Sequence, residues 1–184
     1  MTMQNIRYQL AIPLLGMLIV AWAIAGEITA GEAAPGFSLQ DQNGEWRTLE
    51  QYRGHWVALY FYPKDDTPGC TKEACAFRDN IFAFDDLGAT ILGVSLDDVD
   101  SHQAFAEKYS LPFSILADTK KEVATQYGVY TKIGTFEMAK RESFLIDPDG
   151  QIIKHYETVN PNTHSEEVLA DLRVLLGKTE AKTL

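Results

Sequence analysis

The run His55–Pro63, HWVALYFYP, constrains the fold of this chain more than any other stretch. It is rich in aromatic and β-branched residues and has almost no polar break, which is typical of a strand covered on both faces. A second run of this kind, Ala89–Leu96, follows it along the chain. In the segment between the two runs, the apolar residues have the spacing of a helix. Strands and helices that alternate first, followed by an antiparallel pair late in the chain, predict a mixed α/β sheet with helices on both faces.

The expected helix between these strands covers Thr71–Gly88, where apolar residues recur at intervals of three and four. Gly88 is a candidate C-cap. The apolar positions of this stripe are Ala74, Phe77, Ile81 and Phe84.

Turn residues and periodicity predict the other elements. Asn43-Gly44 indicates an N-terminal β-hairpin. Pro148-Asp149-Gly150 indicates a turn between two antiparallel strands late in the chain. The hairpin strands are expected at Phe37–Leu39 and Trp46–Leu49, the late pair of strands within Glu142–Glu157, and a short strand at Phe113–Asp118. Helices are expected over Asp98–Ser110, with Asp100 or Ser101 as the N-cap, and over Lys120–Gly128. A last helix is expected to begin at Ser165 and to have Leu169, Leu172, Leu175 and Leu176 on one face.

Composition places the chain among globular proteins. It has 184 residues, of which 46% are hydrophobic and 23% charged, as expected for one domain. The net charge is -10, with both signs interspersed. No basic stripe is present to neutralise phosphates, so nucleic acid is not expected as a partner.

The N-terminal segment differs from the rest. Arg7 is followed by the apolar run Leu10–Gly26, which is shorter than the roughly 20 residues of a membrane-spanning helix. The triplet Ala23-Ile24-Ala25 provides a plausible cleavage site. We therefore expect residues 1–25 to be an export signal and residues 26–184 to form a single domain, located outside the cytosol in a bacterial periplasm. A membrane tether through residues 10–26 is the alternative.

Both cysteines lie in one short segment, PKDDTPGCTKEAC, which is Pro63–Cys75. Cys70 is expected in the first turn of the helix, where unsatisfied N–H groups and the helix dipole favour a thiolate over a thiol. The thiolate is the nucleophile, so Cys70 is predicted to be the reactive cysteine. Thr67 lies three residues upstream, where a turn aims its hydroxyl towards the thiol, and Pro63 is placed to shield the sulfur from water.

The spacing of the cysteines argues against a permanent crosslink. Five helical residues separate two Cα atoms by ~8.5 Å. A disulfide needs Cα atoms closer than about 7 Å. Cys70 and Cys75 can therefore bond only if the first helical turns unwind.

The pattern Pro63-x-x-x-Thr67-x-x-Cys70 resembles the active-site signature of the peroxiredoxins. The longer segment FYPKDDTPGCTKEAC is similar to the bacterioferritin comigratory protein, or peroxiredoxin Q, branch of that family. YRGHWVALYFYP and RESFLIDPDG resemble the same branch in the same order, so the likeness covers most of the chain from about Ala34 onward. One departure is TKIGTFEMAKR, which lacks the glycine often found two residues before the matching arginine.

The resemblance implies a thioredoxin-like fold and a thiol-dependent peroxidase that needs no metal or organic cofactor. It implies that Cys70 is the peroxidatic cysteine, with Pro63, Thr67 and Arg141 in its pocket, and that Cys75 is the resolving cysteine. The substrates expected are hydrogen peroxide and organic hydroperoxides. Thioredoxin or a similar dithiol protein is the expected reductant, and a monomer is the expected state.

Other interpretations stay open from the residues alone. Cys75 can be a packing residue, Thr67 a capping residue, and Arg141 a surface ion pair. Glu73 is interpreted as a partner of the helix dipole rather than a catalytic base. A thioredoxin-type oxidoreductase would want a Cys-x-x-Cys pair, which this chain lacks. A non-enzymatic exported redox sensor or disulfide-exchange module is the alternative function.

Overall fold

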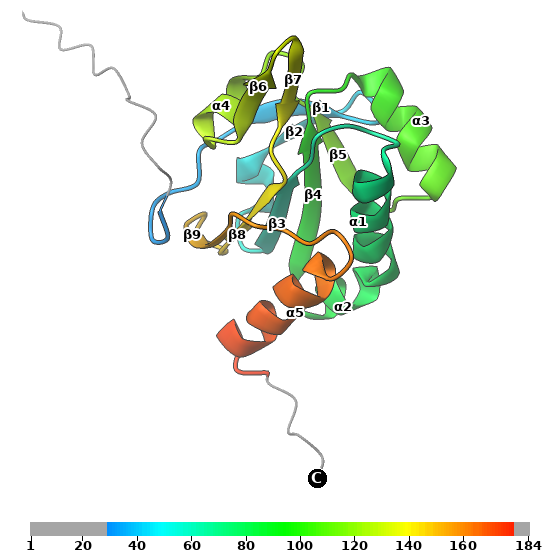
Figure 1. Ribbon diagram of the computed structural model, residues 1–184. Coiled ribbons are helices and arrows are strands. Elements are labelled where there is room, and N and C mark those ends of the chain that lie inside the picture. Colours follow the sequence, from blue (N-terminus) through cyan, green and yellow to red (C-terminus); the bar gives the residue numbers. More distant parts are fainter. Residues whose placement is uncertain (1–28, 179–184) are drawn as a thin grey trace, which may run out of the picture.

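The computed structural model describes residues 29–178 (Figure 1). The predicted export signal or tether, residues 1–25, lies outside the described residues. Within the described part of the chain, no helix is both long enough and apolar enough to cross a bilayer.

A seven-stranded sheet forms the centre of the domain, in the order β2-β1-β5-β4-β3-β8-β9. β3 runs parallel to β4, and β4 runs parallel to β5. The outer pairs, β1 with β2 and β8 with β9, are antiparallel, as is β3 with β8. The predicted mixed sheet is confirmed. The strands are β1 (Ser38–Asp41), β2 (Trp46–Thr48), β3 (Trp56–Phe61), β4 (Ala89–Ser95), β5 (Ser114–Ala117), β8 (Glu142–Ile146) and β9 (Ile152–Tyr156).

Helices cover both faces of this sheet, as the sequence predicts (Figure 1). One apolar cluster joins the sheet to α1 (Pro68–Asp79), α2 (Ile81–Asp86), α3 (Val99–Tyr109) and α5 (His164–Leu175). The other cluster joins the opposite face to η1 (Leu49–Tyr52) and α4 (Glu122–Gln126). The sheet is therefore the middle layer of three, which resembles the expected thioredoxin-like arrangement.

β3 has the character that its apolar run predicts. All its residues from Val57 to Phe61 are buried. Ala58 and Tyr60 face the cluster that contains α1, whereas Leu59 and Phe61 face the opposite cluster. Covered on both faces and paired at both edges, β3 is a rigid support for the segment that leads from its end into α1.

The single helix expected over Thr71–Gly88 is in fact two helices, because the chain bends at Asn80. The Asn80 side chain donates to the carbonyl of Ala76 at 3.0 Å and to the hydroxyl of Ser165 in α5 at 3.1 Å. An asparagine that bonds nearby backbone competes with the helical hydrogen bonds. The break thus fixes the end of α1 against α5.

Three further details differ from the sequence-based predictions. The N-cap of α3 is Asp98, whose carboxylate accepts from Ser101 N at 2.9 Å, and not Asp100 or Ser101. Leu175 of α5 is 46% exposed, so Val168 completes the buried face of that helix instead. A second sheet was not predicted: β6 (Tyr130–Ile133) and β7 (Phe136–Ala139) form a separate antiparallel hairpin.

Candidate active site

Cys70 is buried at the start of α1, directly after the segment that follows β3. Thr67 is the N-cap and Pro68 the first helical residue, a position where proline costs no hydrogen bond. Cys70 is the third residue of the helix. Its sulfur thus lies in the turn where N–H groups have no helical carbonyl to bind and where the dipole favours negative charge.

Arg141 reaches Cys70 from the other side of the site. It directly precedes β8, whose first residue, Glu142, pairs with Phe61 at the end of β3. This register places Arg141 beside the start of α1. Its Nη2 donates to Cys70 Sγ at 3.2 Å. The structure therefore brings together these two predicted site residues, which are 71 positions apart in sequence.

Glu73 is the partner of Arg141, and not a residue of the first helical turn as the sequence suggested. Its carboxylate is fully buried and accepts from Arg141 Nη1, while its second oxygen has no hydrogen-bond partner. Burial raises the pKa of Glu73 to about 7, although the charge and hydrogen bond of Arg141 act in the opposite direction. Glu73 holds the guanidinium against the thiol, because the two Nη atoms are divided between carboxylate and sulfur.

Thr67 and Pro63 lie on the segment that connects β3 to α1, and both are partly exposed. The hydroxyl of Thr67 donates to the carbonyl of Lys64 at 3.0 Å. A hydroxyl has one hydrogen and two lone pairs, so in this arrangement Thr67 offers only an acceptor to a bound molecule. The hydroxyl proton is thus directed to the backbone and not to the Cys70 sulfur, towards which the sequence predicts the hydroxyl to point.

Cys75 lies five positions after Cys70 in the same helix, α1, and both thiols are free. It is partly exposed, whereas Cys70 is buried. The helix is intact between them, and the helical separation of ~8.5 Å excludes a disulfide in this conformation. The structure therefore does not bring the two predicted redox cysteines into contact.

Tyr60 is a site residue that the sequence analysis missed. Its ring stacks on that of Phe77 of α1, with the ring centroids 4.8 Å apart, and its buried hydroxyl has no hydrogen-bond partner among residues 29–178. Burial raises its pKa well above the ordinary value, and the charges of Glu73 and Cys70 act in the same direction. The alternation of β3 is the signal that could have found it, because it puts Tyr60 on the same face as α1.

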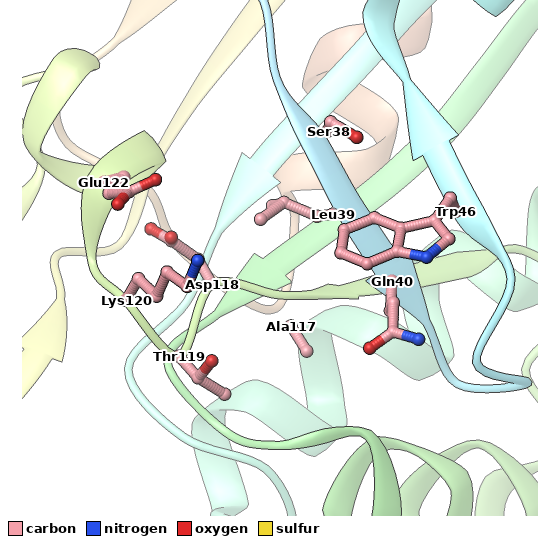
Figure 2. A pocket seen from close by; sticks show the side chains of 9 residues that line it. All are labelled: Ser38, Leu39, Gln40, Trp46, Ala117, Asp118, Thr119, Lys120 and Glu122. Atoms are coloured by element: carbon pink, nitrogen blue, oxygen red, sulfur yellow. The ribbon is translucent and has the colours of Figure 1, made fainter.

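Figure 2 shows a pocket of about 180 Å³ at the edge of the sheet near β1 and the start of α4. Trp46, Lys120 and Asp118 are among its lining side chains, and none of the predicted site residues is. Asp118 has a structural role, since its carboxylate accepts a hydrogen bond from the backbone N–H of Ala124 in α4 at 2.7 Å. Within residues 29–178, no group of three His, Cys, Asp or Glu side chains is placed to hold a metal ion.

Comparison with known proteins identifies the family of this chain. Residues 30–155 match the AhpC/TSA family. Peroxiredoxin Bcp of Bacillus subtilis is 41% identical over 155 residues, which cover 82% of this chain and 99% of that protein.

Two solved structures are also similar. Peroxidoxin BcpB of Mycobacterium tuberculosis superposes with a TM-score of 0.76 at 35% identity, covering 80% of this chain and 98% of that one. The bacterioferritin comigratory protein of Xanthomonas campestris, whose structure was described for its alkyl peroxide reduction activity, superposes with a TM-score of 0.74 at 33% identity, covering 80% and 99%. The expected fold and family are therefore confirmed. The chain belongs to the AhpC/TSA family and, within it, to the peroxiredoxin Q/Bcp group of thiol peroxidases.

Proposed function

We propose that this peroxidase reduces hydroperoxides with Cys70 as the attacking residue and Cys75 as the residue that resolves the product. The observation that carries the proposal is the 3.2 Å contact between Arg141 Nη2 and Cys70 Sγ at the start of α1. A fixed cation and a helix N-terminus both stabilise a thiolate, which is the reactive form of cysteine.

In the first step the Cys70 thiolate attacks one oxygen of the peroxide and the O–O bond breaks. Cys70 becomes a sulfenic acid, and the other oxygen takes a proton and leaves as water or an alcohol. Arg141 is the group that stabilises negative charge on the leaving oxygen. Thr67 has the complementary role, because its free lone pairs can accept the O–H of the attacked peroxide and orient it.

In the second step the sulfur of Cys75 attacks the Cys70 sulfur, a disulfide forms, and the sulfenic oxygen leaves as water. The first turns of α1 must unwind for this to happen, since both cysteines lie in that helix. A dithiol protein of the thioredoxin type then reduces the disulfide by exchange, which returns both thiols.

We further propose that the protein is a monomer that works outside the cytosol. Export rests on the apolar run Leu10–Gly26 and on the small residues that end at Ala25. N-terminal sequencing of protein recovered from fractionated cells tests it. A chain that starts near Gly26 in the exported fraction supports cleavage, and an intact N-terminus in the membrane fraction supports the tether.

Peroxide consumption with a thioredoxin system tests the proposed roles of the cysteines. Cys70→Ser is expected to abolish turnover. Cys75→Ser is expected to consume one equivalent of peroxide and then stop, as Cys70 remains a sulfenic acid or is oxidised further. Unchanged multiple turnover in Cys75→Ser would refute the role of Cys75 as the resolving residue. Residual turnover in Cys70→Ser would refute the role of Cys70 as the nucleophile.

A further inference from the structure

Two consecutive aspartates tie the segment before Cys70 to α3, a helix that contributes no residue to the site described above. Asp66 lies at the surface, where its carboxylate accepts from Lys108 Nζ at 2.7 Å and from Tyr109 Oη at 2.6 Å. Exposed pairs of this kind contribute little stability. Asp65 is different in its burial and in the number of its partners.

Asp65 is 7% exposed, and both of its carboxylate oxygens are hydrogen-bonded. Oδ2 accepts from Ser101 Oγ and from His102 Nδ1, both at 2.8 Å, and Oδ1 accepts from the Tyr62 hydroxyl at 2.7 Å. The backbone N–H of Asp65 donates to Asp97 Oδ2 at 2.9 Å. One residue thus joins the end of β3, the segment after β4, and α3.

The charge of Asp65 suits this arrangement. Burial alone raises its pKa, but the hydrogen bond and charge of His102, with the hydroxyls of Tyr62 and Ser101, outweigh that effect and leave the pKa below its ordinary value. An ionised carboxylate that accepts three side-chain donors forms the stronger class of hydrogen bond. Asp65 is therefore a fixed point of the connection between β3 and α1.

The other end of α1 is fixed as well. Phe77 packs edge-on against His164 of α5, with ring centroids 5.7 Å apart, and Asn80 donates to Ser165 of the same helix. Between Asp65 and Phe77 lies the part of the chain that must unwind before Cys70 meets Cys75. Arg141 contacts this part of the chain through Cys70 and Glu73.

We propose that Asp65, held by Ser101 and His102 of α3, is a positioning residue that keeps the turn carrying Thr67 and Cys70 in its peroxide-reactive geometry and sets the upstream limit of the unwinding segment. The inference rests on the proposed roles of Cys70 and Cys75. It assigns to α3 a part in the reaction, although no residue of α3 belongs to the site described above.

Loosening this anchor should change the two chemical steps in opposite directions. Attack on peroxide needs Cys70, Thr67 and Arg141 held in register, and small displacements of such groups cost large factors in rate. Disulfide formation needs the same turn to open, and opening becomes easier when an anchor is lost. Loss of a residue with a purely structural role would lower thermal stability without slowing one chemical step and accelerating the other.

The test is rapid-mixing kinetics of Asp65→Asn beside the wild type, with Asp66→Asn as the matched control. Asp66 has a positive φ of 55°, which asparagine tolerates, so the control keeps its backbone conformation. In Asp65→Asn we expect the rate constant for peroxide attack to fall about ten- to hundredfold. We expect the step from sulfenic acid to disulfide to become faster, and overoxidation at high peroxide to decrease. Asp66→Asn should stay within about twofold of the wild type in every step.

His102 supplies a second pair of variants in case Asp65→Asn folds poorly. Asparagine at position 102 keeps a donor near the place of Nδ1 and removes Nε2, which has no partner in the structure. We expect His102→Asn to stay close to the wild type and His102→Leu to reproduce the opposed changes of Asp65→Asn. Circular dichroism and thermal unfolding confirm that each variant is folded at the assay temperature.

The outcomes separate this inference from the proposed function. If the wild type itself forms no sulfenic acid at Cys70, the proposed function fails. If the wild type reacts, and folded Asp65→Asn and His102→Leu react like Asp66→Asn, the positioning role of Asp65 is wrong and the proposed function stands. If both steps slow equally, Asp65 supports the fold without setting the limit of the unwinding segment, and the inference is also overturned.

Discussion

At the scale of residues, the site depends on how one guanidinium is shared. Arg141 gives one Nη to the Cys70 sulfur and the other to the buried carboxylate of Glu73. The carboxylate orients the cation, and the cation favours the thiolate. Removing Arg141 alone also leaves Glu73 buried without a partner, and an uncompensated buried charge destabilises a protein by about 3–5 kcal/mol. A test of Arg141 must therefore deal with Glu73 at the same time.

The double variant Glu73→Gln/Arg141→Gln separates catalysis from stability. We expect it to fold, because neither member of the Glu73–Arg141 pair is left as an unpaired buried charge, and to react with peroxide about 10²–10³-fold more slowly, as when one stabilising donor is lost from other active sites. Stopped-flow measurement of the peroxide step provides the rate, and alkylation of Cys70 across a pH series reports its thiolate fraction. A double variant as fast as the wild type would show that Arg141 does not activate Cys70.

Glu73 should also make stability depend on pH. Its pKa is about 7 in the folded protein, against an ordinary value of 4.5. The folded state therefore binds the proton more tightly than the unfolded state. The contribution of Glu73 to the free energy of unfolding is fully present below about pH 4.5 and is lost as the pH rises through 7. Urea unfolding of wild type and Glu73→Gln should show the wild-type advantage shrinking from pH 5 to about pH 8. A difference that grows with pH would contradict the raised pKa.

Glu73 also shows what could be predicted from the sequence and what could not. Cys70, Thr67 and Arg141 follow from a motif and a resemblance, and the structure places Arg141 against the sulfur. Glu73 is three residues after Cys70, a spacing that puts both on one face of a helix. Its ion pair depends on Arg141, which is distant in sequence, so spacing alone does not show that its carboxylate is buried.

At the scale of elements, α1 has two tasks. Intact, it presents Cys70 at its N-terminus; in the proposed mechanism it must also unwind so that Cys70 reaches Cys75. Its first turn contains Gly69, which allows Arg141 to approach. A Cβ at Gly69 would lie 3.1 Å from Arg141 Nη2, closer than an ordinary contact. The glycine therefore serves the site at some cost to the helix, because glycine is a poorer helix former than alanine.

Gly69→Ala should thus change activity and stability in different directions. We expect the melting temperature to stay equal or rise, since alanine favours the helix. We expect the rate of peroxide attack to fall by up to about tenfold, since the methyl group must push the guanidinium by a few tenths of an ångström from its place beside Cys70. The control is Lys72→Ala, an exposed change in the same helix. Full activity in Gly69→Ala would show that Arg141 tolerates the displacement.

Element prediction succeeded where burial creates a pattern and failed where it does not. The apolar run of β3 and the alternating order of strands and helices were enough to predict the main sheet. In the β6–β7 hairpin Ala139 alone among the strand residues is buried, so the sequence carries no regular alternation of apolar and polar residues. The break between α1 and α2 depends on the contact of Asn80 with Ser165 in α5, which no local pattern contains.

At the scale of the whole molecule, the fold separates a rigid support from a short movable segment. The two apolar clusters lie on opposite faces of the sheet, and β3 is paired with β4 at one edge and with β8 at the other. The site lies where β3 ends and β8 begins, and only the turns that follow it must open. The proposed mechanism thus requires local unfolding of a few residues rather than a rearrangement of the domain.

The central claim is that Cys70 reacts first and that Cys75 then meets it through local opening of α1. Treating the reduced protein with one equivalent of hydroperoxide, followed by mass spectrometry of intact chains and peptides over time, tests it most directly. We predict oxygen addition at Cys70, then its loss as a Cys70–Cys75 disulfide forms within one chain. First oxidation at Cys75, or a Cys70 oxygen adduct that never becomes that disulfide, would contradict the account.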